Sequence, residues 1–211
     1  MKKTTPTPET EPSDECYTLA DDMRRVRDVL RKIDLDPASC AHAQRVVRAV
    51  RFFTKAQNGL SKRWRGRVWM NCPFSNPKPW VIKLLASFNA GDVVESVSVF
   101  NSRTGSQWFD LMSAQAWRCE CRKRRKFWGP WTNDESGGGK QDHVFFYLGP
   151  NPERFAAVFG EVGRIIPPTP SVTEGVTFCE ACTRPLIGLR ADATTCGARC
   201  RKRKQRMQAA A

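Results

Sequence analysis

The spacing of apolar residues along the chain predicts alternating helices and strands. Apolar residues recur at helical spacing in several segments, and β-branched or aromatic runs between them are typical of buried strands. The expected helices have apolar faces built on Met23, Val26, Leu30 and Ile33; on Ala43, Val46, Val47 and Val50; on Trp80, Val81, Leu84, Leu85 and Phe88; on Trp108, Leu111 and Met112; and on Phe155, Val158, Phe159 and Val162. The expected strands cover residues 33–36, 68–70, 93–100, 118–128 and 144–148. This alternation predicts an α/β fold with a sheet of parallel strands.

Composition shifts divide the chain into four parts. Residues 1–15 are polar and rich in Pro and Thr, which predicts a disordered tail. Residues 16–166 carry the helix and strand pattern and form the expected main domain. The prolines that follow predict a stiff linker over residues 167–176, and residues 177–211 form a cysteine-rich, basic module.

The charge balance points to a partner of opposite sign. The formal net charge is +14, from 35 Lys and Arg against 21 Asp and Glu, and a nucleic acid is the commonest partner for such an excess. No run of about 18 apolar residues is present, so we expect no membrane span. The start of the chain lacks the apolar stretch of a signal peptide, which favours a cytoplasmic location, in a bacterial host. No protein partner is evident from the sequence.

The residues directly after the strand at 68–70 carry the most informative chemistry. Asn71, Cys72, Pro73 and Phe74 stand where open α/β sheets bind ligands, beyond the carboxyl end of a strand. The exocyclic amine of adenine is a poor nucleophile because its lone pair is delocalised into the ring. The side-chain oxygen of Asn71 and the main-chain oxygen of Cys72 could hold its two hydrogens. Pro73 favours an extended Cys72, and Phe74 offers a face for a flipped-out base.

A set of motifs in a fixed order resembles one family. The motifs are the step at residues 33–39, Arg51-Phe52-Phe53-Thr54, Asn58-Gly59-Leu60, Trp64, the run from Val68 into Asn71, Trp108-Phe109, the run at residues 145–149, Arg154-Phe155 and Val158-Phe159. Over about residues 15–166 this order resembles the phage-type DNA adenine-N6 methyltransferases. The resemblance implies a Rossmann-like, S-adenosylmethionine-dependent methyltransferase fold.

By this resemblance, the cofactor is S-adenosylmethionine and the substrate is adenine in double-stranded DNA. The donor pocket would be lined by Asp34, Asp36, Pro37, Ala38 and Ser39, and the target base would be held by Asn71, Cys72, Pro73 and Phe74. Two positions depart from the family pattern. Cys72 replaces a usual Pro, and Leu19 follows Thr18 where the family tends to have Pro.

Two basic segments are candidates for contact with DNA. Cations interleaved with aromatic residues near position 120 suit phosphate contact and base stacking, although a solvated edge strand would look the same. A second basic run follows the last cysteine. The expected DNA-binding residues are Arg122, Lys123, Arg124, Arg125, Lys126, Arg201, Lys202 and Arg203.

The last cysteines form two pairs with the spacing of a small metal module. Cys179 and Cys182 are separated by two residues, and Cys196 and Cys200 by three. Four thiolates in a reducing compartment suit tetrahedral zinc, and free thiols are the alternative. The segment is too short to fold on a core of its own, so we expect a zinc-ribbon-like module stabilised by the metal.

The predicted function is therefore methyl transfer to the N6 amine of adenine in DNA. Two alternatives stay open at this point. A catalytically degenerate chain could keep the fold and only bind DNA, using the zinc tail. The same site could also methylate another conjugated amine, such as cytosine N4, a base in RNA or a glutamine amide.

Overall fold

The computed structural model describes residue 14 and the ranges 16–128, 142–169, 179–181, 193–195 and 197–209. The strands are β1 (Tyr17–Thr18), β2 (Leu35–Asp36), β3 (Arg51–Phe52), β4 (Gly66–Met70), β5 (Val93–Asn101), β6 (Trp117–Cys121), β7 (Phe127–Trp128), β8 (His143–Leu148) and β9 (Gly163–Ile166). The helices are α1 (Ala20–Leu30), α2 (Gln44–Val47), the 3-10 helix η2 (Gly59–Ser61), α3 (Lys78–Asn89), α4 (Gln107–Gln115), α5 (Pro152–Phe159) and α6 (Ala198–Ala209).

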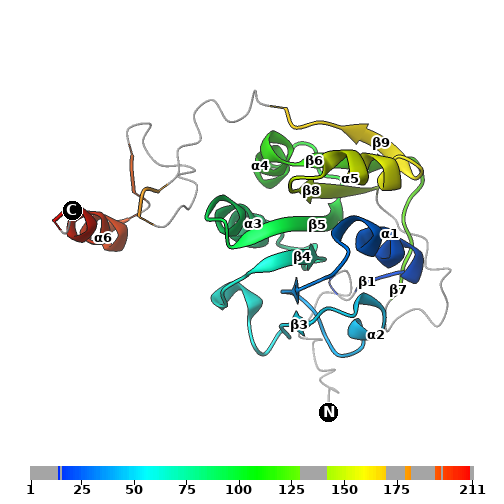
Figure 1. The fold of residues 1–211 in the computed structure, drawn as a ribbon, viewed down its shortest axis with the longest axis horizontal. Coiled ribbons are helices and arrows are strands. Elements are labelled where there is room, and N and C mark those ends of the chain that lie inside the picture. The colour runs from blue at the N-terminus through cyan, green and yellow to red at the C-terminus, as the bar shows by residue number, and fades with distance from the viewer. Residues whose placement is uncertain are drawn as a thin grey trace, which may run out of the picture.

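A mixed sheet of seven strands organises the main domain (Figure 1), in the order β3-β2-β4-β5-β8-β6-β9. The strands β3, β2, β4 and β5 are parallel, as the sequence predicted for β2, β4 and β5; β3 was not predicted as a strand. The expectation of an all-parallel sheet is wrong for the other half, because β8 runs antiparallel between β5 and β6, and β9 runs antiparallel to β6. Apolar runs show that a strand is buried but not its direction, which is set by the connections.

Helices cover both faces of this sheet and create two apolar cores. Alternate residues of β8 divide between them: Val144, Phe146 and Leu148 face α3 and α4, whereas Phe145 and Tyr147 face α1 and α5. This alternation follows from the two-residue period of a strand. The two cores fix the sheet from both sides, so the loops at the strand ends stand on a rigid support.

Two predicted elements differ from the structure. The second helix is a single turn, α2, because Arg48 adopts a left-handed conformation directly after it. Val50, predicted to lie on the apolar face of that helix, is therefore 70% exposed. The predicted strand at 118–128 divides into β6 and β7, which belong to different sheets; β7 pairs with β1, not with the main sheet.

The described parts of the cysteine-rich segment form a small unit around α6. Cys179 and Ala181 are buried, and Ala193 and Cys200 pack against them. The main-chain nitrogen of Glu180 donates to the oxygen of Thr194 at 3.0 Å. Within the described ranges, no helix is long and apolar enough to cross a membrane. The predicted linker falls within the described residues only at positions 167–169.

Candidate active site

A cavity of about 610 Å³ opens at the carboxyl ends of β2 and β4. These strands are neighbours in the sheet, and the chain leaves them in opposite directions, toward β3 on one side and β5 on the other. Ligands of open α/β sheets bind at such a point, and the volume suits a molecule of cofactor size. Residues from both strand ends line the cavity: Asp36, Pro37, Ala38, Ser39, Asn71 and Pro73, with Tyr17, Thr18, Lys55 and Trp80 around them.

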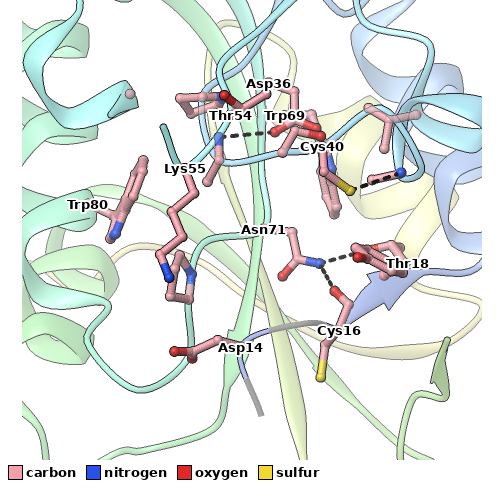
Figure 2. A pocket seen from close by; sticks show the side chains of 18 of the residues that line it. Asp14, Cys16, Thr18, Asp36, Cys40, Thr54, Lys55, Trp69, Asn71 and Trp80 are labelled. Carbon is pink, nitrogen blue, oxygen red and sulfur yellow. Dashed lines mark hydrogen bonds between the residues drawn. The ribbon is translucent and has the colours of Figure 1, made fainter. Parts of the chain in front are cut away.

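The amide of Asn71 is held in one orientation (Figure 2). Its nitrogen donates to the main-chain oxygen of Cys16 at 2.7 Å and to the hydroxyl oxygen of Thr18 at 3.2 Å. In Figure 2 the amide oxygen points away from both partners. The site therefore presents a side-chain acceptor at the wall of the cavity, while the donor nitrogen is occupied.

The residues after Asn71 separate into lining and buried positions. Pro73 lines the cavity. Cys72 is buried, and this burial raises the pKa of its thiol well above the usual range, so the thiol stays protonated. Phe74 is 7% exposed and is not among the lining residues; its ring lies 5.7 Å from that of Phe127 and 6.0 Å from that of His143.

The loop after β2 forms the opposite wall of the cavity. Asp36 is only 2% exposed, and burial raises the pKa of its carboxyl to about 7, against the effect of hydrogen bonds from its neighbours. Its oxygens accept from the Ala38 nitrogen at 3.3 Å and from the Gln44 amide at 2.8 Å. Gln44 also donates to the Ser39 hydroxyl at 2.8 Å, which joins the loop to α2.

Asp34, also predicted for the donor pocket, lies elsewhere in the structure. Its carboxylate pairs with the Lys32 ammonium at 2.8 Å and accepts from the Arg67 nitrogen at 2.9 Å. Partial burial acts to raise the pKa of Asp34, but these hydrogen bonds outweigh burial and leave the pKa below its usual value. Asp34 is not among the residues that line the cavity. Its hydrogen bond with the Arg67 main-chain nitrogen links the start of β2 to β4.

Asp36 gives the free energy of unfolding a particular pH dependence. Its native pKa of about 7 lies above the ordinary value of 3.8, so between these values the native chain binds more protons than the unfolded chain. The stability contributed by the neutral carboxyl is complete at low pH and is lost as the pH rises through about 7.

We therefore expect Asp36→Asn to gain stability relative to the native chain as the pH rises from about 4 to about 7. Urea unfolding at several pH values within that window measures the difference in the free energy of unfolding. The matched control is Asp28→Asn at an exposed position, which should change the free energy of unfolding little. A difference between Asp36→Asn and the native chain that stays constant with pH would contradict the prediction.

Several site residues were not predicted from the sequence. Asp14, which falls in the expected disordered tail, accepts from the Ser75 nitrogen at 2.9 Å and from its hydroxyl at 2.7 Å. Thr18 contacts Asn71 from a strand of two residues, too short to give a periodic pattern. Trp80 was expected only on the apolar face of a helix, yet it also lines the cavity and stacks on Trp64. Contacts between residues so far apart along the chain leave no pattern in the local sequence.

The basic residues near position 120 have different surroundings. Arg122 donates to the main-chain oxygens of Gly160 and Glu161, and Arg124 forms an exposed ion pair with Asp142. Lys123 and Lys126 are exposed.

Arg125 differs from its neighbours. Its guanidinium forms a two-pronged ion pair with the buried carboxylate of Asp22, which also faces Arg25. The structure thus gives Arg125 a role in holding its segment to α1. In α6, Arg201, Lys202 and Arg203 are exposed.

The four cysteines predicted to bind zinc fall partly outside the described residues. Cys179 and Cys200 belong to one packed cluster, whereas Cys182 and Cys196 lie outside the described ranges. Within those ranges no group of three or more His, Cys, Asp or Glu residues is placed to hold a metal ion.

The fold and the cavity place the chain in a broad class. The sheet is a mixed seven-stranded α/β sheet with a parallel core. The cavity lies between β2 and β4, which the chain leaves in opposite directions. Both features are consistent with a methyltransferase fold. The family model described as DNA N-6-adenine-methyltransferase (Dam) matches residues 18–151. The chain belongs to this family, which confirms the resemblance seen in the sequence.

A curated relative agrees with this family. The protein named DNA N-6-adenine-methyltransferase of Haemophilus phage HP1 (strain HP1c1) is 31% identical over 107 residues. The match covers 50% of this chain and 58% of the phage protein, so the chain spans less than two thirds of the length of that relative.

Proposed function

We propose that this chain transfers a methyl group from S-adenosylmethionine to the N6 amine of adenine in DNA. The observation that carries the proposal is the acceptor oxygen of Asn71 at the wall of the cavity, with the amide nitrogen already bonded to Cys16 and Thr18. Membership of the DNA N-6-adenine-methyltransferase family supports both the reaction and the substrate.

The proposed chemistry needs two acceptors around the adenine amine. The Asn71 oxygen would accept one N6 hydrogen, and the main-chain oxygen of Cys72 would accept the other. These bonds draw electron density onto the nitrogen and favour its tetrahedral form, so that its lone pair can form the new bond to carbon. As this bond forms, the bond between the methyl carbon and the sulfonium sulfur would break, its electron pair would stay on the sulfur, and S-adenosylhomocysteine would leave. The N6 nitrogen, then cationic, would lose one proton to water. Because Cys72 acts through its backbone, its protonated thiol takes no part in the reaction.

The proposed donor site is the part of the cavity beside the loop after β2. The volume of about 610 Å³ fits a cofactor-sized molecule, and the buried Asp36 carboxyl offers an acceptor inside it. Asp36, Pro37, Ala38 and Ser39 would hold S-adenosylmethionine, which when bound supplies an electrophilic methyl group on a sulfonium. Gly59 keeps the opposite loop close, since a Cβ there would collide with the Pro37 carbonyl. Asp34 would act only by fixing the position of β2.

The target base would enter beside Pro73. An adenine inside a duplex cannot reach a cavity of this kind, so we propose that it is flipped out of the stack. Phe74 would support the flipped base once its ring is uncovered from Phe127 and His143. Burial lowers the pKa of His143 to about 4, so this neighbour is neutral and adds no charge beneath the base.

Exposed cations would hold the DNA backbone. Lys123 and Lys126 in the segment after β6, and Arg201, Lys202 and Arg203 in α6, are exposed and suited to phosphate contact. Arg122 and Arg124 would contribute through donors that their present contacts leave available. Arg125 is excluded from this set because of its ion pair with Asp22.

We propose in addition that the C-terminal segment binds zinc through Cys179, Cys182, Cys196 and Cys200. The packing of Cys179 with Cys200 supports this set, because it brings one cysteine of each pair into the same cluster. The hydrogen bond between Glu180 and Thr194 joins the chain next to the first pair to the chain just before the second. We expect about one zinc per purified chain by elemental analysis. Replacing Cys179 and Cys200 by Ser should remove the metal, whereas Cys40→Ser should not. Full metal content in the double variant would contradict the proposal.

Transfer of radiolabelled methyl groups tests the proposed function. The 211-residue chain is incubated with labelled S-adenosylmethionine and unmethylated double-stranded DNA, and the DNA is then digested to nucleosides. Label in N6-methyladenine is the expected result. Label in N4-methylcytosine, or only with RNA, would show a different substrate, and DNA binding without label would show a non-catalytic binding protein.

A further inference from the structure

The described residues just before α1 are residue 14 and residues 16–19. They contact both ends of the motif that runs from Asn71 to Ser75. At one end, the Asp14 carboxylate accepts from the nitrogen and the hydroxyl of Ser75. At the other, Cys16 and Thr18 accept from the Asn71 amide. We propose that this segment sets the direction of the Asn71 amide, with Thr18 as a positioning residue, and that it makes Asn, and not Asp, the residue that works at position 71.

The partner of the amide decides its orientation. A main-chain oxygen can only accept, so the Asn71 atom that lies 2.7 Å from the Cys16 oxygen has to be the nitrogen. A reversed amide would bring two acceptors together at that distance and would turn its NH2 group toward the cavity. That group could not accept a hydrogen from a substrate amine. Cys16 and Thr18 therefore favour the amide orientation that the proposed function needs, with the oxygen toward the cavity. The catalytic part of the inference rests on that function.

The strand β1 gives the positioning contact a firm base. Tyr17 and Thr18 pair with Trp128 and Phe127 of β7, and Thr18 is buried. The ion pair between Arg125 and Asp22 joins the residues just before β7 to the first turn of α1, directly after β1. The direction of a side chain at position 71 thus depends on a segment more than 50 residues further along the chain.

An aspartate at position 71 would meet the opposite conditions. Its ionised carboxylate would face the Cys16 oxygen without a hydrogen to share, whereas its neutral form could donate to that oxygen and still present an acceptor to the cavity. Asn71→Asp should therefore recover activity, relative to the native chain, as the pH falls. The other titratable groups around the cavity are Asp14, Asp36, Lys55, Cys16, Tyr17 and Cys40, and they are the same in both chains, so the ratio isolates position 71.

Side-chain amide NMR on the labelled full chain tests the orientation without any need for turnover. The Asn71 NH2 signals are assigned by their loss in Asn71→Asp. We expect slow exchange of these protons with solvent in the native chain. Thr18→Val, which keeps the shape and removes the acceptor, should shift them, and Thr18→Ser should restore them. The exposed Thr104→Val is the control. Signals that exchange rapidly, or that ignore Thr18→Val, overturn the inference.

Kinetics on the same variants test the consequence. Loss of one hydrogen bond should lower kcat for Thr18→Val roughly fivefold, with donor affinity unchanged, and Thr18→Ser should stay near the native value. The ratio of Asn71→Asp to native activity should rise as the pH is lowered from about 9 to about 6. Equal losses in Thr18→Val and Thr18→Ser, or a ratio that is flat with pH, count against the inference. If the native chain makes no methylated product, the proposed function fails, and the NMR experiment still decides the orientation.

Discussion

Asn71→Ala should reduce methyl transfer by a factor on the order of 100 to 1,000, because it removes one of the two acceptors proposed to hold the adenine amine. The loss should appear in kcat. Donor affinity should change little, since Asp36 and its loop are untouched by the substitution. Initial rates at saturating donor, together with equilibrium binding of the donor, separate these two quantities.

The control for this prediction is a second asparagine. Asn89, exposed at the end of α3, lies outside the set of residues that line the cavity. Asn89→Ala should keep native turnover. We expect Asn71→Ala to remain folded, because the substitution removes the two hydrogen bonds from the side chain to Cys16 and Thr18. Circular dichroism would verify this. Turnover by Asn71→Ala close to that of the native chain would rule out the assigned role of its oxygen.

Arg125→Ala should lower the free energy of unfolding by about 3–5 kcal/mol, the usual cost of leaving one charge of a buried pair alone. The side chain of Asp22 is 2% exposed and that of Arg125 is 19% exposed, so solvent cannot replace the lost partner easily. Arg25, 3.6 Å from the same carboxylate, would compensate only in part. Urea unfolding followed by Trp fluorescence gives the difference in free energy.

The neighbouring residue provides the matched control. Arg124 pairs with Asp142, and their side chains are 61% and 72% exposed. Because exposed ion pairs stabilise proteins by at most about 1 kcal/mol, Arg124→Ala should be close to neutral. DNA affinity should fall more for Arg124→Ala than for Arg125→Ala if the assigned roles are right. Equal stability losses in the two variants would show that the Asp22 contact is not structural.

The sequence predicted best the elements whose own residues decide their structure. The helix α3 carries a clear periodic pattern, the strands β4, β5 and β8 carry apolar or β-branched runs, and each is buried against a core. The elements it missed, β1, β3 and β9, have two to four residues, and their conformation depends on a partner strand far along the chain. The direction of the strands in the sheet could not be predicted for the same reason. A buried run such as β8 has the same apolar pattern whether it lies parallel or antiparallel to its neighbours.

The candidate site follows the same division. Asn71 and Asp36 could be found because Asn71 directly follows β4 and Asp36 is the last residue of β2, and in the structure both line the cavity. Asp34 is two residues from Asp36 but faces Lys32 and Arg67, a difference that a short apolar-acidic step cannot reveal. Thr18 could not be placed beside Asn71, because the two are brought together by folding over 53 residues.

The position of β8 in the sheet has a consequence for the order of assembly. The two strands beside β6 are β8 and β9, and both are synthesised after it. A growing chain that ends near residue 121 can therefore complete the parallel half of the sheet, but β6 has no strand to join and β5 keeps an open edge. Contacts that await later residues slow folding and leave such edges available to other chains. Nascent chains halted before residue 148 should thus depend on the ribosome or on chaperones to stay soluble.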